Sequence, residues 1–254
     1  MLIQSQITEL NTRLQNSDPK DILRELFCLI PKTVLSFSGA EDVILVDMAT
    51  KIRPDLKIFT LDTDRLHSET YRFIEKVRAY YKINIDMLKP DSEQLRDFVK
   101  QKGRYSFYED GHEECCTIRK VAPLQDKLCH HDAWITGQRR DQNPNRAEVA
   151  IIELDQVFSN NGHQVIKINP LANWNSEQVW SYIRMSDIPY NELHDQGYAS
   201  IGCEPCTRAI KPNEHERAGR WWWEETTIKE CGLHIRNEDE EQNRNSEEIN
   251  PRTD

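Results

Sequence analysis

The sequence predicts an α/β fold: a mainly parallel, twisted sheet with helices on both faces, in a single domain with a mobile C-terminal segment. Short apolar runs that suit strands alternate with longer segments of helical periodicity. Strands separated by roughly 10–15 residues of helical pattern pair in parallel, because a crossover helix returns the chain to the same edge of the sheet. The chain has 254 residues, which at about 150 residues per domain is one large domain or two small ones.

The predicted elements follow from apolar spacing and from helix-start signals. The first helix covers Met1–Asn16, where apolar residues recur at helical spacing. Asp18 and Pro19 then mark the start of a second helix, because aspartate caps helices and proline suits the first helical position. The later predicted strands are Thr33–Phe37, Lys57–Leu61, Ile83–Leu88, Ala133–Thr136 and Gln164–Ile168, and the later predicted helices are Glu41–Thr50, His67–Tyr81, Asp91–Lys102 and Asn175–Met185.

Three regions are expected along the chain. Residues 1–30 are helices that pack on the core, residues 31–235 form the main domain, and residues 236–254 form an acidic tail. The tail has seven acidic residues, three basic residues and one isoleucine. So little apolar surface cannot offset the entropy of ordering a chain, and we expect the tail to be disordered.

Composition excludes several classes of protein. The chain carries 33 Lys and Arg against 43 Asp and Glu, a net charge of -10, and an acidic protein is a poor non-specific partner for nucleic acid. Its longest apolar runs, such as Val43–Val46, are too short to span a bilayer, so no membrane association is expected. The first residues lack the pattern of a secretory signal. The seven cysteines are therefore expected in the reducing cytoplasm, where they indicate metal binding or catalysis more often than disulfides.

A loop of small residues, Ser36-Phe37-Ser38-Gly39-Ala40-Glu41-Asp42, lies between a predicted strand and a predicted helix. Small residues let a ligand approach the backbone, and the free N–H groups at a helix start favour an anion. Ligands bind at this end of the strands in parallel sheets. The loop lacks the Gly-Lys-Ser/Thr ending of a Walker A motif, and a capped strand-to-helix turn would explain it equally well.

Two cysteine pairs, Cys115-Cys116 and Cys203-x-x-Cys206, form the clearest candidate metal site. Four thiolates that meet would repel one another unless a metal centre neutralised their charge. Adjacent cysteines chelate a single tetrahedral ion awkwardly because their side chains diverge, whereas a four-iron cubane offers separated corners. From spacing alone, structural zinc and a four-iron, four-sulfur (4Fe-4S) cluster both remain open.

The remaining cysteines have different expected roles. Cys231 is followed by Gly232 and His234 near the end of the sequence, where a mobile segment and nearby cations would favour a reactive thiolate. From spacing alone, a lone cysteine near a terminus is usually a simple free thiol. Cys28 and Cys129 each adjoin apolar residues and are predicted to be core thiols.

Local clusters of basic residues stand out in this acidic chain. Arginine's planar fork suits phosphate and sulfate oxygens, although scattered surface cations are the simpler interpretation of each cluster. Trp221–Trp223 are expected to anchor the core or an interface, and His112 is expected to be solvated. The basic clusters are Arg119-Lys120, Arg139-Arg140, Arg208-x-x-Lys211 and Arg217-x-x-Arg220.

Longer stretches resemble known families. The loop at Ser36 and the segment Leu61-Asp62-Thr63-Asp64 look like the phosphate-binding and nucleotide-contacting loops of the adenine-nucleotide α-hydrolase superfamily. Five further motifs resemble the assimilatory adenylyl-sulfate (APS) reductases, and together they cover nearly the whole chain except the first helices and the tail. These motifs are Glu114-Cys115-Cys116-Thr117-Ile118-Arg119-Lys120, Ile135-Thr136-Gly137-Gln138-Arg139-Arg140-Asp141-Gln142, Gly202-Cys203-Glu204-Pro205-Cys206-Thr207-Arg208, His215-Glu216-Arg217-x-x-Gly219-Arg220-Trp221-Trp222-Trp223 and Glu230-Cys231-Gly232-Leu233-His234.

The resemblance implies an oxidoreductase of sulfate assimilation and cysteine biosynthesis. It implies that Cys231 attacks APS to give an S-sulfocysteine, that a thioredoxin or similar dithiol carrier releases sulfite, and that Cys115, Cys116, Cys203 and Cys206 hold one 4Fe-4S cluster. The implied substrate contacts are Ser36, Ser38, Gly39, Asp42, Leu61, Asp62, Thr63, Lys120, Gly137, Arg139, Arg140, Arg217, Arg220 and His234.

Three alternatives to this interpretation remain open. The 3′-phosphorylated nucleotide (PAPS) could be the substrate alone, or together with APS. An ATP pyrophosphatase-type adenylating or thiolating enzyme would share the loop at Ser36 without needing Cys231. A metal-stabilised binding module would have no activity at all. The sequence leaves open whether the chain forms a homo-oligomer.

Overall fold

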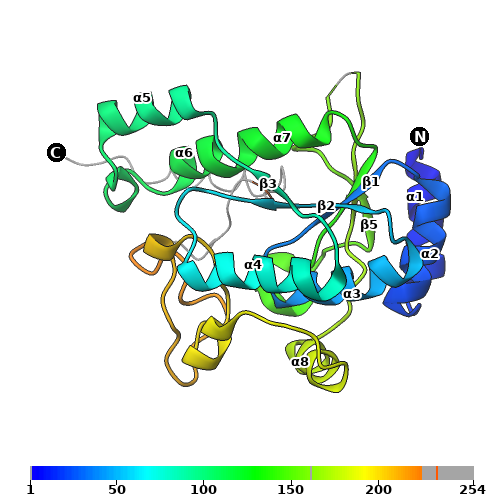
Figure 1. Ribbon diagram of the computed structural model, residues 1–254. Helices are drawn as coiled ribbons and strands as arrows, with labels where there is room; N and C mark the ends of the chain where they lie inside the picture. Colours follow the sequence, from blue (N-terminus) through cyan, green and yellow to red (C-terminus); the bar gives the residue numbers. More distant parts are fainter. Residues whose placement is uncertain (1, 161, 225–232, 234–254) are drawn as a thin grey trace, which may run out of the picture.

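Six strands form one sheet in the order β3-β2-β1-β4-β6-β5. This computed structural model describes residues 2–160, 162–224 and 233 (Figure 1). Neighbouring strands pair in parallel except β5, which runs antiparallel to β6 at the edge. The predicted α/β class with a mainly parallel sheet is confirmed.

The helices and strands agree closely with the predicted ones, although several strands are shorter at their ends than predicted. The strands are β1 (Thr33–Ser36), β2 (Lys57–Leu61), β3 (Asp86–Leu88), β4 (Ala133–Ile135), β5 (Ile152–Leu154) and β6 (Ile166–Ile168). The α-helices are α1 (Gln4–Leu14), α2 (Pro19–Leu29), α3 (Ala40–Ile52), α4 (Ser68–Tyr81), α5 (Ser92–Lys102), α6 (Glu113–Cys116), α7 (Ala122–Leu128) and α8 (Ser176–Met185).

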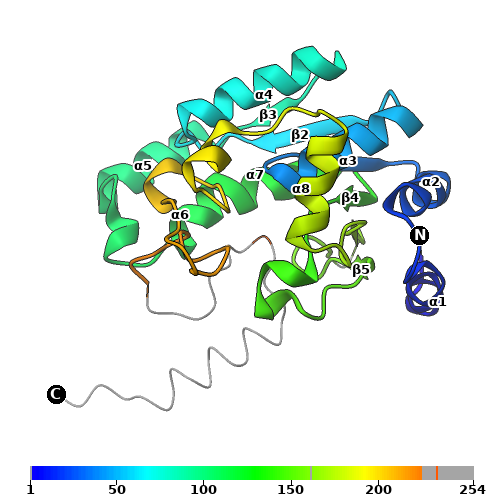
Figure 2. The ribbon, with the colours of Figure 1, turned by 90° about the horizontal axis from the view of Figure 1, so that it is seen from below.

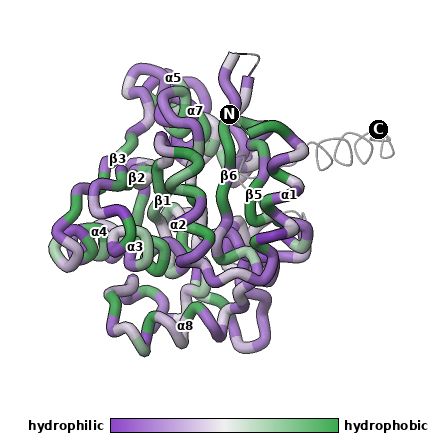
Figure 3. Tube along the Cα trace, turned by 90° about the vertical axis from the view of Figure 1, so that its right-hand side faces the viewer, coloured by the Kyte–Doolittle hydropathy of each residue, from purple (hydrophilic) through white to green (hydrophobic). Residues whose placement is uncertain are grey.

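The sheet is covered on both faces. In Figure 1, α5, α6 and α7 lie above the strands, whereas α3 and α4 lie below them. The central strands are consequently buried on both sides, as the continuous burial of β4 illustrates. Figure 3 shows hydrophobic residues along these strands.

The two N-terminal helices pack on the same core. Ile7, Leu10 and Leu14 of α1 belong to the hydrophobic cluster that includes the sheet residues Leu35 and Ile135. At the sheet edge, the Asn11 side-chain amide donates to Ile152 O at 2.7 Å and its oxygen accepts from Ile152 N at 3.0 Å. These two hydrogen bonds satisfy backbone groups that an edge strand would otherwise leave open.

One continuous helix carries the first cysteine pair. It begins as α6, widens to a π-helix over Thr117–Val121 and continues as α7. Pro123 has no N–H to donate, and its ring would clash with the carbonyl four residues earlier, so a wider turn accommodates it. The predicted basic pair Arg119-Lys120 lies within this π-helical turn, and both side chains are buried.

The structure differs from what the sequence predicts at one strand and at two cysteines. The edge strand β5 was not predicted, because its neighbours Ala150 and Ile151 do not alternate with polar residues. Cys28 and Cys129 are exposed rather than core thiols. Cys28 lies on the outer side of α2, whose buried stripe is Ile22, Leu23, Leu26 and Phe27, and Cys129 follows the last residue of α7.

The loop-rich segment from residue 190 to residue 224 folds against the start of α4, where Leu66 and Cys203 form an isolated antiparallel bridge. It is coloured yellow to orange in Figure 2. Among the described residues, no helix combines the length and the apolar character needed to cross a membrane. Cys231, His234 and the acidic tail lie outside the described residues.

Candidate active site

A pocket with a cavity volume of about 190 Å³ opens at the carboxyl ends of β1, β2 and β4. This strand-end pocket is placed where the strand order reverses between β1 and β4, the position at which open α/β sheets bind ligands. It brings together ten of the predicted substrate contacts: Ser36, Ser38, Gly39, Asp42, Leu61, Thr63, Lys120, Gly137, Arg217 and Arg220.

The loop between β1 and α3 is organised by Asp42. Its carboxylate accepts hydrogen bonds from Ser38 N at 2.8 Å, from Ser38 Oγ at 2.7 Å and from Gly39 N at 3.0 Å. The Ser38 and Gly39 N–H groups are therefore already paired within the loop, whereas the expected anion contacts were the N–H groups at the start of α3. Burial raises the pKa of Asp42 to about 6, against the opposing effect of the Ser38 hydrogen bond.

Gly137 lets the loop after β4 approach this region closely. A Cβ atom added there would lie 2.6 Å from Asp42 Oδ1 and 2.6 Å from the Glu41 Cβ. Real Cβ contacts do not come so close, so any larger residue would push the β4 loop away from α3. The close approach of the β4 loop to α3 thus requires glycine at this position of the pocket wall.

Four buried cations line the strand-end pocket: Lys120, Arg146, Arg217 and Arg220. Each is at most 8% exposed. The Arg220 guanidinium lies over the Trp221 ring at 4.5 Å, and its Nε is buried without a hydrogen-bond partner among the described residues. A buried guanidinium N–H costs free energy unless it is hydrogen-bonded, so an anionic ligand that accepts from this atom would be stabilised here.

Glycine provides the space for Arg220. A Cβ at Gly202 would lie 2.5 Å from Arg220 Cζ, so a larger residue there would require the guanidinium to shift. Residues 216–219 form turns and Arg220 bridges to Thr207, and this loop brings both Arg217 and Arg220 to the pocket.

Arg146 is a pocket residue that was not predicted from the sequence. It is 7% exposed, lines the pocket and donates to Gln142 Oε1 at 2.5 Å. It follows the Arg139-Arg140 cluster by only a few residues, and extending that motif through Asn143-Pro144-Asn145 would have found it.

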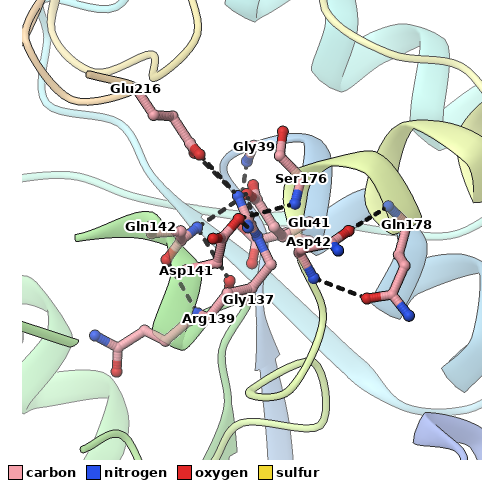
Figure 4. Close-up of polar contacts among 12 residues, drawn as sticks. Gly39, Glu41, Asp42, Gly137, Arg139, Asp141, Gln142, Ser176, Gln178 and Glu216 are labelled. Atoms are coloured by element: carbon pink, nitrogen blue, oxygen red, sulfur yellow. Dashed lines mark hydrogen bonds and ion pairs between the residues drawn. The ribbon is translucent and has the colours of Figure 1, made fainter. Parts of the chain in front are cut away.

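Three predicted contacts lie outside the pocket wall formed by the described residues. Asp62 accepts from Tyr71 Oη at 2.7 Å, and Arg140 donates to Val149 O at 2.8 Å. Arg139 is 1% exposed and donates to Glu41 and to Glu216 (Figure 4). The prediction that these three residues contact a substrate directly gains no support from their positions.

A second pocket is lined by all four paired cysteines: Cys115, Cys116, Cys203 and Cys206. We call it the cysteine pocket. The four thiols are 6–8% exposed and come from α6 and from a 3-10 turn (Glu204–Cys206) almost ninety residues later. Arg65, Arg119 and Lys120 line the same pocket and supply positive charge.

The thiols of the cysteine pocket influence one another. A hydrogen bond from Cys206 holds the pKa of Cys203 well below its usual range, and the same contact raises the pKa of Cys206. The Lys120 charge and a contact with Thr63 Oγ1 at 3.1 Å also favour the Cys203 thiolate. Buried, mutually close thiols beside cations form a donor set that suits zinc or an iron–sulfur cluster. The residues therefore fit a resident metal centre.

Lys120 and Trp221 connect the two pockets. Lys120 lines both of them and lies 5.8 Å from the Trp221 ring. Trp221 is fully buried, as expected of an anchor, and stacks on His112 at 4.0 Å. The expectation that His112 is solvated is wrong: it is 3% exposed and Nδ1 lies 2.8 Å from both Glu224 carboxylate oxygens.

Leu233 is the described residue closest in sequence to the predicted nucleophile. It is 9% exposed and lines the strand-end pocket. Cys231 precedes it by two positions.

The sequence profile of the phosphoadenosine phosphosulfate reductase domain matches residues 32–209. The chain belongs to this family. Adenosine 5'-phosphosulfate reductase of Pseudomonas aeruginosa (strain LESB58) is 56% identical over 230 residues, which cover 90% of this chain and 86% of that protein. Adenosine 5'-phosphosulfate reductase of Allochromatium vinosum is 45% identical over 85% of this chain and 82% of its own length.

Two further similarities concern a longer relative and a solved structure. 5'-Adenylylsulfate reductase 3 of Arabidopsis thaliana is 46% identical over 94% of this chain, which spans about half (53%) of the length of that relative. The crystal structure of the phosphoadenylyl-sulfate (PAPS) reductase from Candida auris in complex with phosphate has a TM-score of 0.69 and 31% identity. That similarity covers 83% of this chain and 98% of the solved one.

Proposed function

We propose that this protein reduces adenylyl sulfate (APS) to sulfite and AMP in sulfate assimilation and cysteine biosynthesis, with electrons from thioredoxin or a similar dithiol carrier. The observation that carries the proposal is the junction of two sites. Buried cations line a strand-end pocket, and one of them, Lys120, also lines a pocket of four cysteines. The names of the relatives, at up to 56% identity, support the same activity.

The substrate would bind with its adenosine and α-phosphate along the loop at Ser36–Asp42 and beside Leu61 and Thr63. Because Asp42 occupies the Ser38 and Gly39 N–H groups, the charge of the phosphosulfate must be met mainly by side chains. Lys120, Arg146, Arg217 and Arg220 supply it. Fixed cations in a desolvated wall stabilise developing charge far better than water does, and they cost no reorganisation during the reaction.

The Cys231 thiolate would then attack the sulfur atom of the phosphosulfate. A sulfur–sulfur bond forms, the bond from sulfur to the phosphate oxygen breaks, and its electron pair leaves with AMP. Without the cations, an anionic thiolate would be repelled by an anionic substrate. The position of Leu233 in the pocket wall, two residues after Cys231, supports this assignment, and the role of His234 as a substrate contact stays a prediction.

A carrier thiolate would next attack the Cys231 sulfur, and sulfite leaves with the electron pair of the sulfur–sulfur bond. The second carrier thiolate then attacks the carrier sulfur of the mixed disulfide and frees Cys231 as a thiolate. The carrier loses two electrons and becomes a disulfide, and the sulfonyl sulfur gains two. A Cys231 segment that closes over the nucleotide and then opens to the carrier would serve both partners.

Cys115, Cys116, Cys203 and Cys206 would hold one 4Fe-4S cluster. When bound, the cluster supplies a compact, electron-rich charge that orders Lys120 and the loop at Cys203. Thiols supply both electrons of the reaction, so we propose a structural and electrostatic role for the cluster. The reducing cytoplasm, which keeps thiols free, suits this chemistry.

The alternative substrate is PAPS, and the name of the Candida auris relative motivates testing it. We favour APS because family members restricted to PAPS usually lack the four cysteines that this chain has. Anaerobic purification followed by iron and sulfide analysis, and then by sulfite release from each nucleotide with reduced thioredoxin, tests the proposal. Iron-containing protein that releases sulfite from APS at a higher kcat/KM supports it, whereas iron-free protein or absence of sulfite contradicts it.

A further inference from the structure

The side chain of Arg139 is enclosed by three carboxylates: those of Glu41 and Glu216 and, 3.3 Å from Nη1, that of the exposed Asp141. Its Nε and Nη2 atoms lie 3.0 Å and 2.9 Å from Glu41 Oε1, and Nη2 lies 3.0 Å and 3.1 Å from the two Glu216 oxygens (Figure 4). Gln142 completes the arrangement, because it donates to Glu41 at 2.9 Å and accepts from Arg139 N at 3.1 Å. Arg139 is 1% exposed, so water cannot replace these contacts.

Glu41 and Glu216 themselves line the strand-end pocket, whereas Arg139 lies behind them. A pocket for an anionic nucleotide thus has three carboxylates in its wall, those of Glu41, Asp42 and Glu216, beside its four cations. Asp42 accepts hydrogen bonds from Ser38 and Gly39 of its own loop, whereas Glu41 and Glu216 both pair with the Arg139 guanidinium on the far side. In a poorly hydrated wall an unpaired carboxylate would act on the substrate through a low effective dielectric constant.

Arg139 also joins three segments that form the pocket. Glu41 lies in the first turn of α3, directly after the loop at Ser36. Arg139 follows the end of β4, and Glu216 directly precedes Arg217, which lines the pocket. The planar fork of arginine can serve two carboxylates at once, which the single ammonium of lysine cannot do equally well.

We propose that Arg139 is a positioning residue for anion binding: it neutralises Glu41 and Glu216 in the pocket wall, so that the charge of the four wall cations is left for the substrate. It makes no contact with the substrate itself. The inference rests on the proposed nucleotide site. It differs from a purely structural role because it concerns the charge that the pocket presents to its ligand.

The test compares a charged and an uncharged ligand of the same site. Arg139→Gln is expected to raise the Kd for AMP by roughly 10- to 100-fold, because the two carboxylates left unpaired would repel its phosphate. The Kd for adenosine should change by less than about threefold, because adenosine carries no negative charge. Isothermal titration of the iron-loaded protein with each ligand measures both constants. An equal change for AMP and adenosine, or no change for AMP, overturns the proposal.

Rescue gives a second readout. The double variant Arg139→Gln with Glu216→Gln is expected to recover AMP affinity to within about fivefold of wild type, because one of the unpaired carboxylates is gone. Failure of this rescue contradicts the neutralising role. Glu216→Gln alone keeps Arg139, so it tests the proposal even if Arg139→Gln does not fold. This variant should bind AMP at least as tightly as wild type does. Weaker binding of AMP contradicts the proposal.

Arg72→Gln is the matched control. Arg72 also pairs with two glutamates, Glu69 at 3.3 Å and Glu192 at 2.5 Å, but it is 60% exposed and outside the described pocket wall. It should leave both Kd values unchanged, and a shift of AMP affinity equal to that of Arg139→Gln overturns the proposal. Wild-type protein that binds neither AMP nor adenosine would instead refute the nucleotide site itself.

Discussion

The strand-end pocket and the cysteine pocket share a wall but are built in different ways. The first is assembled from loops that follow adjacent parallel strands, so sheet topology alone brings Ser36, Leu61 and Gly137 together. The second joins a helix to a distant 3-10 turn, and its cysteines meet only because the segment after residue 190 folds back across α4. The strand-end pocket thus follows from the topology of the sheet. The cysteine pocket depends on long-range packing and on the metal centre that its thiols would bind.

The two pockets also use positive charge differently. In the strand-end pocket the cations share the wall with the carboxylates of Glu41, Asp42 and Glu216. In the cysteine pocket Arg65 and Arg119 meet thiols, and Arg119 Nη1 is additionally fixed by a 2.5 Å hydrogen bond to Thr63 O. Lys120 belongs to both pockets, so substitution of Lys120 tests whether the two pockets function independently of each other.

The largest expected effect separates chemistry from binding. Cys231→Ser should lower sulfite release by at least about a thousandfold, because a serine hydroxyl does not replace a thiolate as the attacking group. AMP affinity and iron content should stay at wild-type values, since neither pocket as described uses this thiol. Sulfite assay, titration calorimetry and iron analysis measure the three quantities. Normal sulfite release from this variant would refute the proposed nucleophile.

The next effect tests whether the cysteine pocket depends on a metal. Cys203→Ser should lose most of the iron and lower the Tm by about 5–10 °C, because metal binding and folding are coupled and each kcal/mol shifts Tm by about 2–4 °C in a domain of this size. Cys28→Ser is the control, since Cys28 is an exposed thiol on α2. If both variants keep iron and the same Tm, the cysteine pocket is not the metal site.

A smaller effect tests the junction of the two pockets. Lys120→Gln should lower kcat/KM for APS by roughly 10- to 100-fold and also change the visible or paramagnetic spectrum of the iron centre, because Lys120 lines both pockets. Arg146→Gln should lower kcat/KM similarly and leave the spectrum unchanged, because Arg146 lines only the strand-end pocket among those described. Identical spectra for both variants would show that Lys120 does not act on the iron centre.

The strand-end pocket was largely predictable from the sequence. Alternating strand and helix patterns fix a parallel sheet, and loops that follow its strands must meet at one edge, so Ser36, Thr63 and Gly137 could be grouped in advance. The placement of single cations was less accessible. Whether Arg139 points into the pocket or toward Glu41 and Glu216 depends on residues 98 and 77 positions away in sequence.

The two cysteine pairs predicted a metal site from their charge, but the choice of a 4Fe-4S cluster came from the motif resemblance. The spacing of the cysteines alone left both zinc and an iron–sulfur cluster open. In addition, nothing in the local sequence indicates that Cys116 and Cys203 lie close together. For Cys28 and Cys129, apolar neighbours in sequence suggested burial, but both thiols are exposed. The helix phase of α2 places Cys28 on the surface, and Cys129 lies just beyond the end of α7. Arg146 was missed for a related reason, since it lies in a short 3-10 turn (Pro144–Arg146) without apolar periodicity.

The smallest expected effect concerns Asp42 and the pH dependence of stability. Its pKa is raised from 3.8 to about 6 in the folded protein, so the folded state holds this proton more tightly than the unfolded chain does. The resulting stabilisation is fully present below the unfolded pKa and is lost as pH rises through about 6. Between pH 5 and pH 7.5, the free energy of unfolding of wild type should fall by about 1.4 kcal/mol relative to Asp42→Asn, which has no proton to lose. Urea unfolding of both proteins at the two pH values measures the difference, and parallel pH profiles would mean that the three hydrogen bonds to Asp42 outweigh its burial.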